Sequence, residues 1–133
     1  MLNPPTESTE QQKLIQWLRL KKIFHFSPNN ENQSSFTNRT VAIRVEAKAK
    51  SMGKIKGASD LIVMLPNKIL FIELKRAKKT LKSGKLSISH TKVSDEQKSF
   101  MKRVNEFDYA DAYIAYGANE AMQIIQNNME ITK

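Results

Sequence analysis

The chain is organised around residues 57–75, which read GASDLIVMLPNKILFIELK. Two apolar runs rich in β-branched residues flank Pro66-Asn67, a pair typical of a tight turn, so this stretch is predicted to form a β-hairpin. A loop centred on that pair places Asp60 directly opposite Glu73, and such cross-strand neighbours are close. Lys75 shares their face because strand side chains alternate with a period of two. The sequence therefore predicts two carboxylates and an ammonium group at one end of the hairpin.

Two interpretations of this charge cluster are open. Like-charged carboxylates beside apolar strands cost free energy unless a cation lies between them. Mg²⁺ takes oxygen ligands, and one or two carboxylates with water and substrate phosphate are a common set. The cluster is therefore either a divalent metal site on Asp60 and Glu73 or an inert salt bridge of both acids with Lys75, and a one-residue β-bulge would break the register.

Length and composition favour one globular domain. The 133 residues, 40% of them hydrophobic, fit a single α/β or α+β domain that spans 1–133. The longest apolar run falls short of the roughly 20 residues of a membrane helix, and the N-terminus has no secretory signal pattern. The absence of Cys excludes disulfides and thiolate metal sites. We therefore expect a cytoplasmic protein with no membrane partner.

Positive charge is concentrated in the middle of the chain. The formal net charge is +9, and residues 44–92 hold thirteen basic residues against three acids, Glu46, Asp60 and Glu73. A basic region around an acidic focus is what a phosphodiester-cleaving site needs, because cations hold backbone phosphates and carboxylates hold metals. The alternative is a solvated, Lys-rich surface that aids solubility.

Two polar residues outside the hairpin have competing interpretations. Glu10 lies on the apolar stripe of a helix predicted to start at Thr6–Ser8, where it can face a site, although an acid near a helix start can also complement the helix dipole. Gln97 follows Ser94 at capping-box spacing, yet it also lies on the inward stripe with Phe100. The other predicted elements are a strand at 23–26, helices at 41–52, 94–107 and 119–131, a strand at 109–116 and aperiodic segments at 29–40 and 76–92.

Several short motifs occur in a fixed order along the chain. They are Glu10-Gln11, Pro28-Asn29-Asn30-Glu31, Gly57-Ala58-Ser59-Asp60, Glu73-Leu74-Lys75, Ser94-x-x-Gln97 and Tyr116-Gly117. This set resembles the virus-type replication-repair nuclease (VRR-NUC) domain, a branch of the PD-(D/E)XK nuclease superfamily, over nearly the whole chain. Ser59 replaces the Pro that often precedes the motif Asp, at a position that varies in the superfamily.

The resemblance implies a fold and a chemistry. The fold would be α/β, a restriction-endonuclease-like PD-(D/E)XK core with a mixed β-sheet flanked by helices. The activity would be that of an Mg²⁺- or Mn²⁺-dependent DNA endonuclease. The implied metal ligands are Asp60, Glu73, the Leu74 backbone carbonyl and Glu10, and the implied further catalytic residues are Lys75 and Gln97.

The resemblance also implies a substrate and an assembly. Family members with this domain alone resemble Holliday-junction resolvases and tend to act as homodimers. Branched or junction DNA and a homodimer are therefore expected, with a bacterial or phage-encoded origin. The backbone phosphate contacts are expected to come from Lys54, Lys56, Arg76, Lys78 and Lys79.

Other functions of the same fold remain open. The chain could be a nuclease-fold module that binds DNA without cutting it, although the complete set of acids and lysine argues against this. It could also be a flap or single-strand nuclease. A sequence-specific restriction enzyme would need a recognition insertion, for which the chain has little room.

Overall fold

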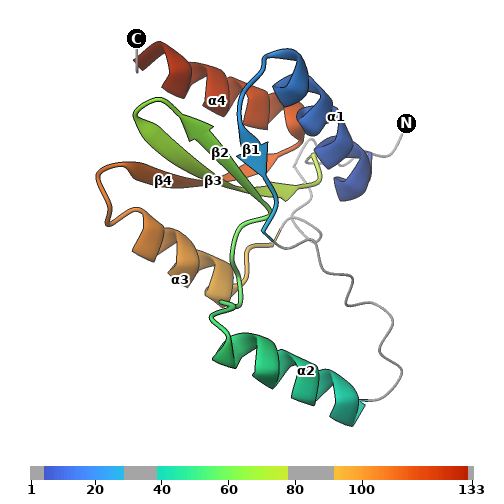
Figure 1. The fold of residues 1–133 in the computed structure, drawn as a ribbon. Coiled ribbons are helices and arrows are strands. Elements are labelled where there is room, and N and C mark those ends of the chain that lie inside the picture. Colours follow the sequence, from blue (N-terminus) through green and yellow to red (C-terminus); the bar gives the residue numbers. More distant parts are fainter. Residues whose placement is uncertain (1–4, 29–38, 78–91, 132–133) are drawn as a thin grey trace, which may run out of the picture.

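The fold is a four-stranded mixed sheet with helices on both faces (Figure 1). The computed structural model describes residues 5–28, 39–77 and 92–131. The elements are α1 (Glu7–Leu20), β1 (His25–Phe26), α2 (Arg39–Ser51), β2 (Leu61–Leu65), β3 (Lys68–Lys75), α3 (Asp95–Val104), β4 (Ala110–Tyr116) and α4 (Ala118–Ile131). In the order β1-β2-β3-β4, the first three strands are antiparallel and β4 runs parallel to β3. The predicted α/β class with a mixed, helix-flanked sheet is confirmed.

The β2–β3 hairpin has the predicted register. Leu65 pairs with Lys68 across the Pro66-Asn67 turn, and Leu61 pairs with Ile72 at the far end. No residue is inserted between these pairs, so Asp60, one residue before β2, lies opposite Glu73. The local turn signal was sufficient because a two-residue loop fixes the pairing of every residue that follows.

One face of the sheet is covered by α1 and α4. Leu14 and Leu18 from α1 and Ile125 from α4 are completely buried, and they belong to one cluster with Leu70 and Ile72 of β3. Burial of each such side chain contributes roughly 1.5–3 kcal/mol. This face holds the larger of the two hydrophobic clusters in the described residues.

The opposite face is covered in part. Val104 and Phe100 of α3 pack against Phe71 and Ala112, with the Phe71 and Phe100 rings 5.8 Å apart in an edge-on contact. The part of this face that lies over β1 and β2 is open, and Met64 is 41% exposed there. Because Asp60 and Glu73 point to this face, the predicted charge cluster lies next to the open part.

Two predicted helices differ from the structure in detail. The helix predicted at 41–52 is observed as α2, but none of its residues is buried and it projects away from the sheet (Figure 1). The stripe of α3 was predicted to reach Phe107, but α3 ends at Val104 and Phe107 is 52% exposed. Asn105, the C-cap residue of α3, accepts a hydrogen bond from the Ala112 N–H through its side-chain oxygen, which turns the chain into β4.

The final helix was predicted correctly, and its apolar side is buried in the core instead of being exposed to solvent. Ala121 and Ile125 are completely buried, and Met122 and Met129 pack against the same core, so α4 does not offer this stripe to another chain. Within the described ranges, no helix has the length and apolarity needed to cross a membrane. Most of the segments predicted to be aperiodic lie outside the described residues, although Arg39 and Thr40 begin α2.

Candidate active site

Backbone hydrogen bonds from the two strands of the hairpin hold the side chains of Asp60 and Glu73. The Asp60 N–H donates to Glu73 Oε2 at 3.2 Å, and the Leu74 N–H donates to Asp60 Oδ2 at 3.2 Å. Glu73 is buried, with 6% of its surface exposed, and Asp60 is half-buried. The hairpin therefore brings the two predicted carboxylates together and fixes both by backbone donors.

Two further predicted residues meet Glu73 at its other oxygen. Lys75 Nζ lies 3.8 Å from Glu73 Oε1, and Gln97 Nε2 donates a hydrogen bond to the same Oε1. Lys75 supplies one positive charge against two carboxylates. A simple salt bridge therefore compensates half of the negative charge of the pair.

The pKa values of both acids are raised above their ordinary values. Burial first, and then the negative charge of Asp60, raise the pKa of Glu73 to about 8 from its ordinary 4.5. Burial also raises the pKa of Asp60, against the opposing effect of the Leu74 hydrogen bond. Ionisation of both acids is therefore unfavourable in this environment unless a cation joins them.

The donor set at this position fits a hard divalent cation. Two carboxylates converge, and the Leu74 carbonyl faces the same side of β3 as the Leu74 N–H that contacts Asp60, because one strand residue directs both groups to one neighbour. No group of three or more His, Cys, Asp or Glu side chains suited to a metal occurs in residues 5–28, 39–77 and 92–131. Asp60, Glu73 and Leu74 would thus supply the protein ligands, with the remaining positions left to water or substrate oxygens.

The Gln97 side chain caps α3 and also contacts Glu73. Its side-chain oxygen accepts from the Ser94 N–H at 3.0 Å, and its backbone N–H donates to Ser94 Oγ at 3.1 Å, which completes the capping box of α3. The amide nitrogen of the same side chain is the Glu73 donor. The cap therefore holds the amide in a fixed orientation toward the carboxylate.

Gly57 fixes the first turn of α3 against the segment that leads to Asp60. Its φ is +86°, and a Cβ there would lie 2.5 Å from the backbone carbonyl carbon of Glu96. Lys56 adds an exposed ion pair to Glu96 at 3.6 Å. A glycine is required because backbone meets backbone at this point.

Glu10 lies at the junction of β4 and α4. Its Oε2 accepts a hydrogen bond from the Ala118 N–H at 3.0 Å. Gly117 has a φ of +94°, and a Cβ at this residue would lie only 2.6 Å from the same oxygen. The Gly117 N–H donates to the Lys75 carbonyl, so Glu10 is at the same end of the sheet as the carboxylate pair. The described residues do not join Glu10 to that pair in one metal-binding group, and its role as a ligand stays a prediction.

One site contact was absent from the sequence prediction. Ser27 Oγ donates to the Asp60 carbonyl at 2.7 Å, across a separation of 33 residues. This bond ties the end of β1 to the residue that carries the carboxylate. A short serine-containing segment gives no sequence signal for a contact of that range.

The predicted phosphate contacts differ in their surroundings. Lys54 and Lys56 are exposed, and with Lys50 they line a hollow between α2, the segment 53–58 and Pro28. Arg76 donates from Nε to the Pro5 carbonyl at 3.1 Å. Lys78 and Lys79 lie outside the described residues. The hollow therefore carries three lysines and one acid, Glu46, and it reaches Ala58, two residues before Asp60.

Comparison with known proteins identifies the fold. No family model and no curated protein matches this sequence. A solved structure described as a "VRR_NUC domain protein" matches with a TM-score of 0.62 at 20% sequence identity, and the alignment covers 97% of this chain and 92% of that chain. The chain therefore has the VRR-NUC nuclease fold, as the order of its motifs predicted.

Proposed function

We propose that this chain is a metal-dependent endodeoxyribonuclease that hydrolyses phosphodiester bonds in branched DNA. The observation that carries this proposal is the Asp60–Glu73 pair, in which a buried and a half-buried carboxylate are held by backbone donors and meet a single lysine. A structural ion pair has no need of such an excess of carboxylate. Strongly perturbed carboxyls beside an open surface are typical of functional sites.

Each residue of the site has a role in this proposal. Asp60, Glu73 and the Leu74 carbonyl would hold Mg²⁺ or Mn²⁺, and the bound ion would supply Lewis acidity toward water and the scissile phosphate. Lys75 orients that water or neutralises the charge that grows on the phosphate in the transition state. Gln97 keeps the Glu73 carboxylate in one orientation, as partners behind metal ligands commonly do. Glu10 remains a candidate further ligand.

The basic hollow would hold the DNA backbone. Lys50, Lys54 and Lys56 surround a space that adjoins Pro28, the residue next to the Ser27 that contacts Asp60. Contacts of this kind give affinity that falls with salt and carries little sequence information. Arg76, Lys78 and Lys79 complete the proposed set of phosphate contacts.

We further propose that the protein acts as a symmetric homodimer on four-way junctions. A junction offers two equivalent strands related by a two-fold axis, and a C2 dimer presents two identical sites in the same relation. The exposed Val41 of α2, which does not line the hollow, is available to such a contact.

One experiment tests these proposals together. Purified protein is incubated with linear, flap, splayed-arm and four-way DNA, each with EDTA, Mg²⁺ or Mn²⁺, and its mass is measured by light scattering at micromolar concentration. We expect metal-dependent paired nicks in the four-way DNA and the mass of a dimer. Binding without cleavage under every metal condition would leave a DNA-binding module. A monomer that cuts flaps or single strands would support the nuclease activity and contradict the proposed action as a dimer on four-way junctions.

A further inference from the structure

Two phenylalanine side chains of the β1 edge are exposed on the open face of the sheet. Phe24 is 65% and Phe26 is 43% exposed, and their ring centroids lie 6.0 Å apart at 49°. Phe26 pairs with Ile62 across the sheet, and the Met64 N–H donates to the Phe24 carbonyl. Phe24, Phe26 and Met64 therefore form one apolar surface, which we term the aromatic edge.

The aromatic edge adjoins the carboxylate pair on the same face. Strand alternation directs Phe26 and Ile62 to the side of the sheet that Asp60 and Glu73 also face. Asp60 is two residues from Ile62, which is about 7 Å along the strand, and β1 is about 5 Å away across it. Ser27, between Phe26 and Pro28, is bonded to the Asp60 carbonyl. A nucleotide next to a phosphate at Asp60 can therefore reach the Phe26 ring.

The position of the aromatic edge limits what can cover it. Exposed aromatic side chains in a group indicate a binding surface, because each ring in water forgoes burial energy. A protein bound permanently at this edge would stand over Asp60 and obstruct substrate. If the occupant is the DNA substrate itself, the rings are covered on binding and access to Asp60 is not obstructed. The phosphates of the DNA would then lie toward the lysines of the hollow beside Pro28.

The chemistry of the rings selects unpaired bases. Within a duplex each base face is already stacked on its neighbours, whereas a single strand, or a branch point at which base pairs have opened, offers free faces. Aromatic side chains stack on such faces with little sequence preference. The edge carries two rings and a methionine, which suit base faces and not phosphates.

We propose that Phe24 and Phe26 form a stacking platform for unpaired bases, which directs cleavage to single-stranded segments at branch points. This inference rests on the proposed nuclease function and supplies its substrate selectivity. The platform acts in binding, before any bond is broken, so it can be measured in EDTA.

The test compares single-stranded and duplex DNA of one length by fluorescence anisotropy in EDTA. The Phe24→Ala/Phe26→Ala protein is expected to lose about tenfold or more in affinity for oligo(dT), with little change for the duplex. Phe24→Tyr/Phe26→Tyr should retain the wild-type affinity. A 2-aminopurine in the single strand should be quenched on binding to the wild type and not to the alanine variant.

The chain supplies a matched control in Phe107 and Tyr109. These rings are 52% and 57% exposed and 5.6 Å apart, but they precede β4 at the other end of the sheet from Glu73. Phe107→Ala/Tyr109→Ala should leave single-strand affinity unchanged. Equal losses in both variants, an equal loss for duplex, unchanged oligo(dT) binding, or conversion of a dimer to a monomer by the Phe24/Phe26 substitutions would overturn the platform.

The failure of this inference is distinct from the failure of the proposed function. Wild-type protein that cuts DNA with metal while the Phe24→Ala/Phe26→Ala protein binds and selects substrates normally would remove the platform alone. The opposite result is that the wild type cuts no DNA, while the Phe24→Ala/Phe26→Ala protein still loses affinity for single strands. That result would contradict the nuclease function and support a surface that only binds single strands.

Discussion

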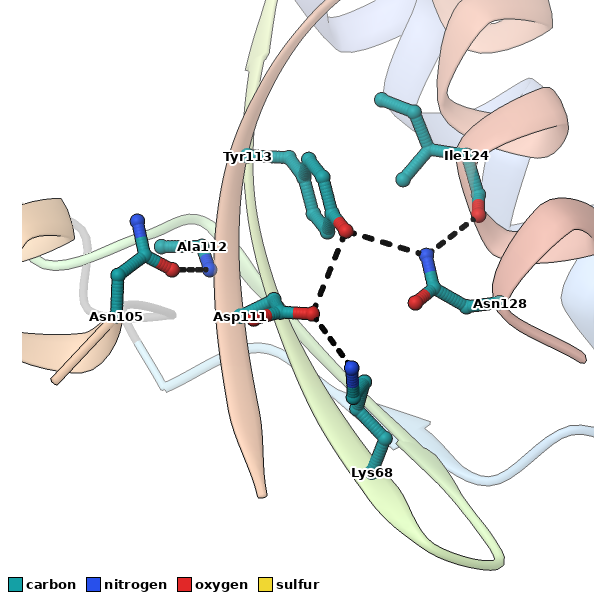
Figure 2. A network of polar contacts seen from close by, with 7 residues as sticks. All are labelled: Lys68, Asn105, Asp111, Ala112, Tyr113, Ile124 and Asn128. Carbon is teal, nitrogen blue, oxygen red and sulfur yellow. Dashed lines mark hydrogen bonds and ion pairs between the residues drawn. The ribbon is translucent and has the colours of Figure 1, made fainter. Parts of the chain in front are cut away.

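Strand β3 has a lysine next to carboxylate at each end, and the two ends differ in charge balance. At its start, Lys68 Nζ lies 2.9 Å from Asp111 Oδ2, and the Tyr113 hydroxyl donates to the same oxygen at 3.4 Å (Figure 2). Asn128 Nδ2 extends this network by donating to the Tyr113 hydroxyl and to the Ile124 carbonyl. At the end of β3, Lys75 meets two acids.

The difference separates a charge-balanced cluster from an unbalanced one. One cation matches one carboxylate at Lys68, and the neighbouring Asp111 raises the pKa of Lys68, which means that the charged form is favoured. At Glu73 the folded environment disfavours the charged form instead. A charge cluster that lowers the stability of the unliganded protein is expected at a site where a bound ligand completes the charge balance.

The largest effect is expected from paired Asp→Asn substitutions at the two ends. Asp60→Asn can still accept from the Leu74 N–H, so the fold should persist while DNA cleavage falls by about 10³-fold or more through loss of a metal ligand. Asp111→Asn should leave cleavage unchanged and lower stability by about 1 kcal/mol or less, because its ion pair is partly exposed. Cleavage rates and urea midpoints check both, and equal cleavage by Asp60→Asn and wild type would contradict the assignment of the site.

A smaller effect is expected from removal of the two lysines. Lys75→Met should lower turnover at saturating DNA by about 10²-fold with unchanged DNA affinity, because its ammonium acts on charge that develops in the reaction. Lys68→Met should lower the melting temperature by a few degrees and leave turnover as it was. Single-turnover kinetics and DNA affinity separate these outcomes. If Lys75→Met lost affinity and kept its turnover, Lys75 would be a phosphate anchor.

The smallest effect is a pH dependence of stability, to which the two ends of β3 contribute in different pH ranges. The raised pKa of Glu73 means that the folded protein holds a proton which the unfolded chain releases above pH 4.5. The contribution of Glu73 to the stability of the fold is therefore full below pH 4.5 and is lost as the pH rises to about 8. The pKa of Lys68 is raised above 10.5, so its contribution is lost only in strong alkali. Asp60→Asn should therefore gain more stability over wild type at pH 8 than at pH 5.

Metal addition sharpens the same comparison. At pH 8, Mg²⁺ should raise the urea midpoint of the wild type and have little effect on Asp60→Asn, since a ligand stabilises the state that binds it. Asp111→Asn should respond to Mg²⁺ as the wild type does. Equal responses of all three proteins would show that the ion does not bind at Asp60.

Features that depend on neighbouring residues could be predicted from the sequence. The Pro66-Asn67 turn fixed the hairpin register and hence the meeting of Asp60 with Glu73. Ser94 with Gln97 specified the cap of α3. These predictions succeed because a tight turn and a capping box are local geometries, set by residues a few positions apart.

Tertiary structure decided the features that depend on distant residues. It placed Gln97 on Glu73, bonded Ser27 to Asp60 and set Glu10 beside Gly117. It also packed α3 on β3 and β4, and Phe24 and Phe26 on β1 are exposed on the same face. No local pattern encodes these results, because each depends on how far one packed element extends over another, and that extent is settled when the whole core is filled.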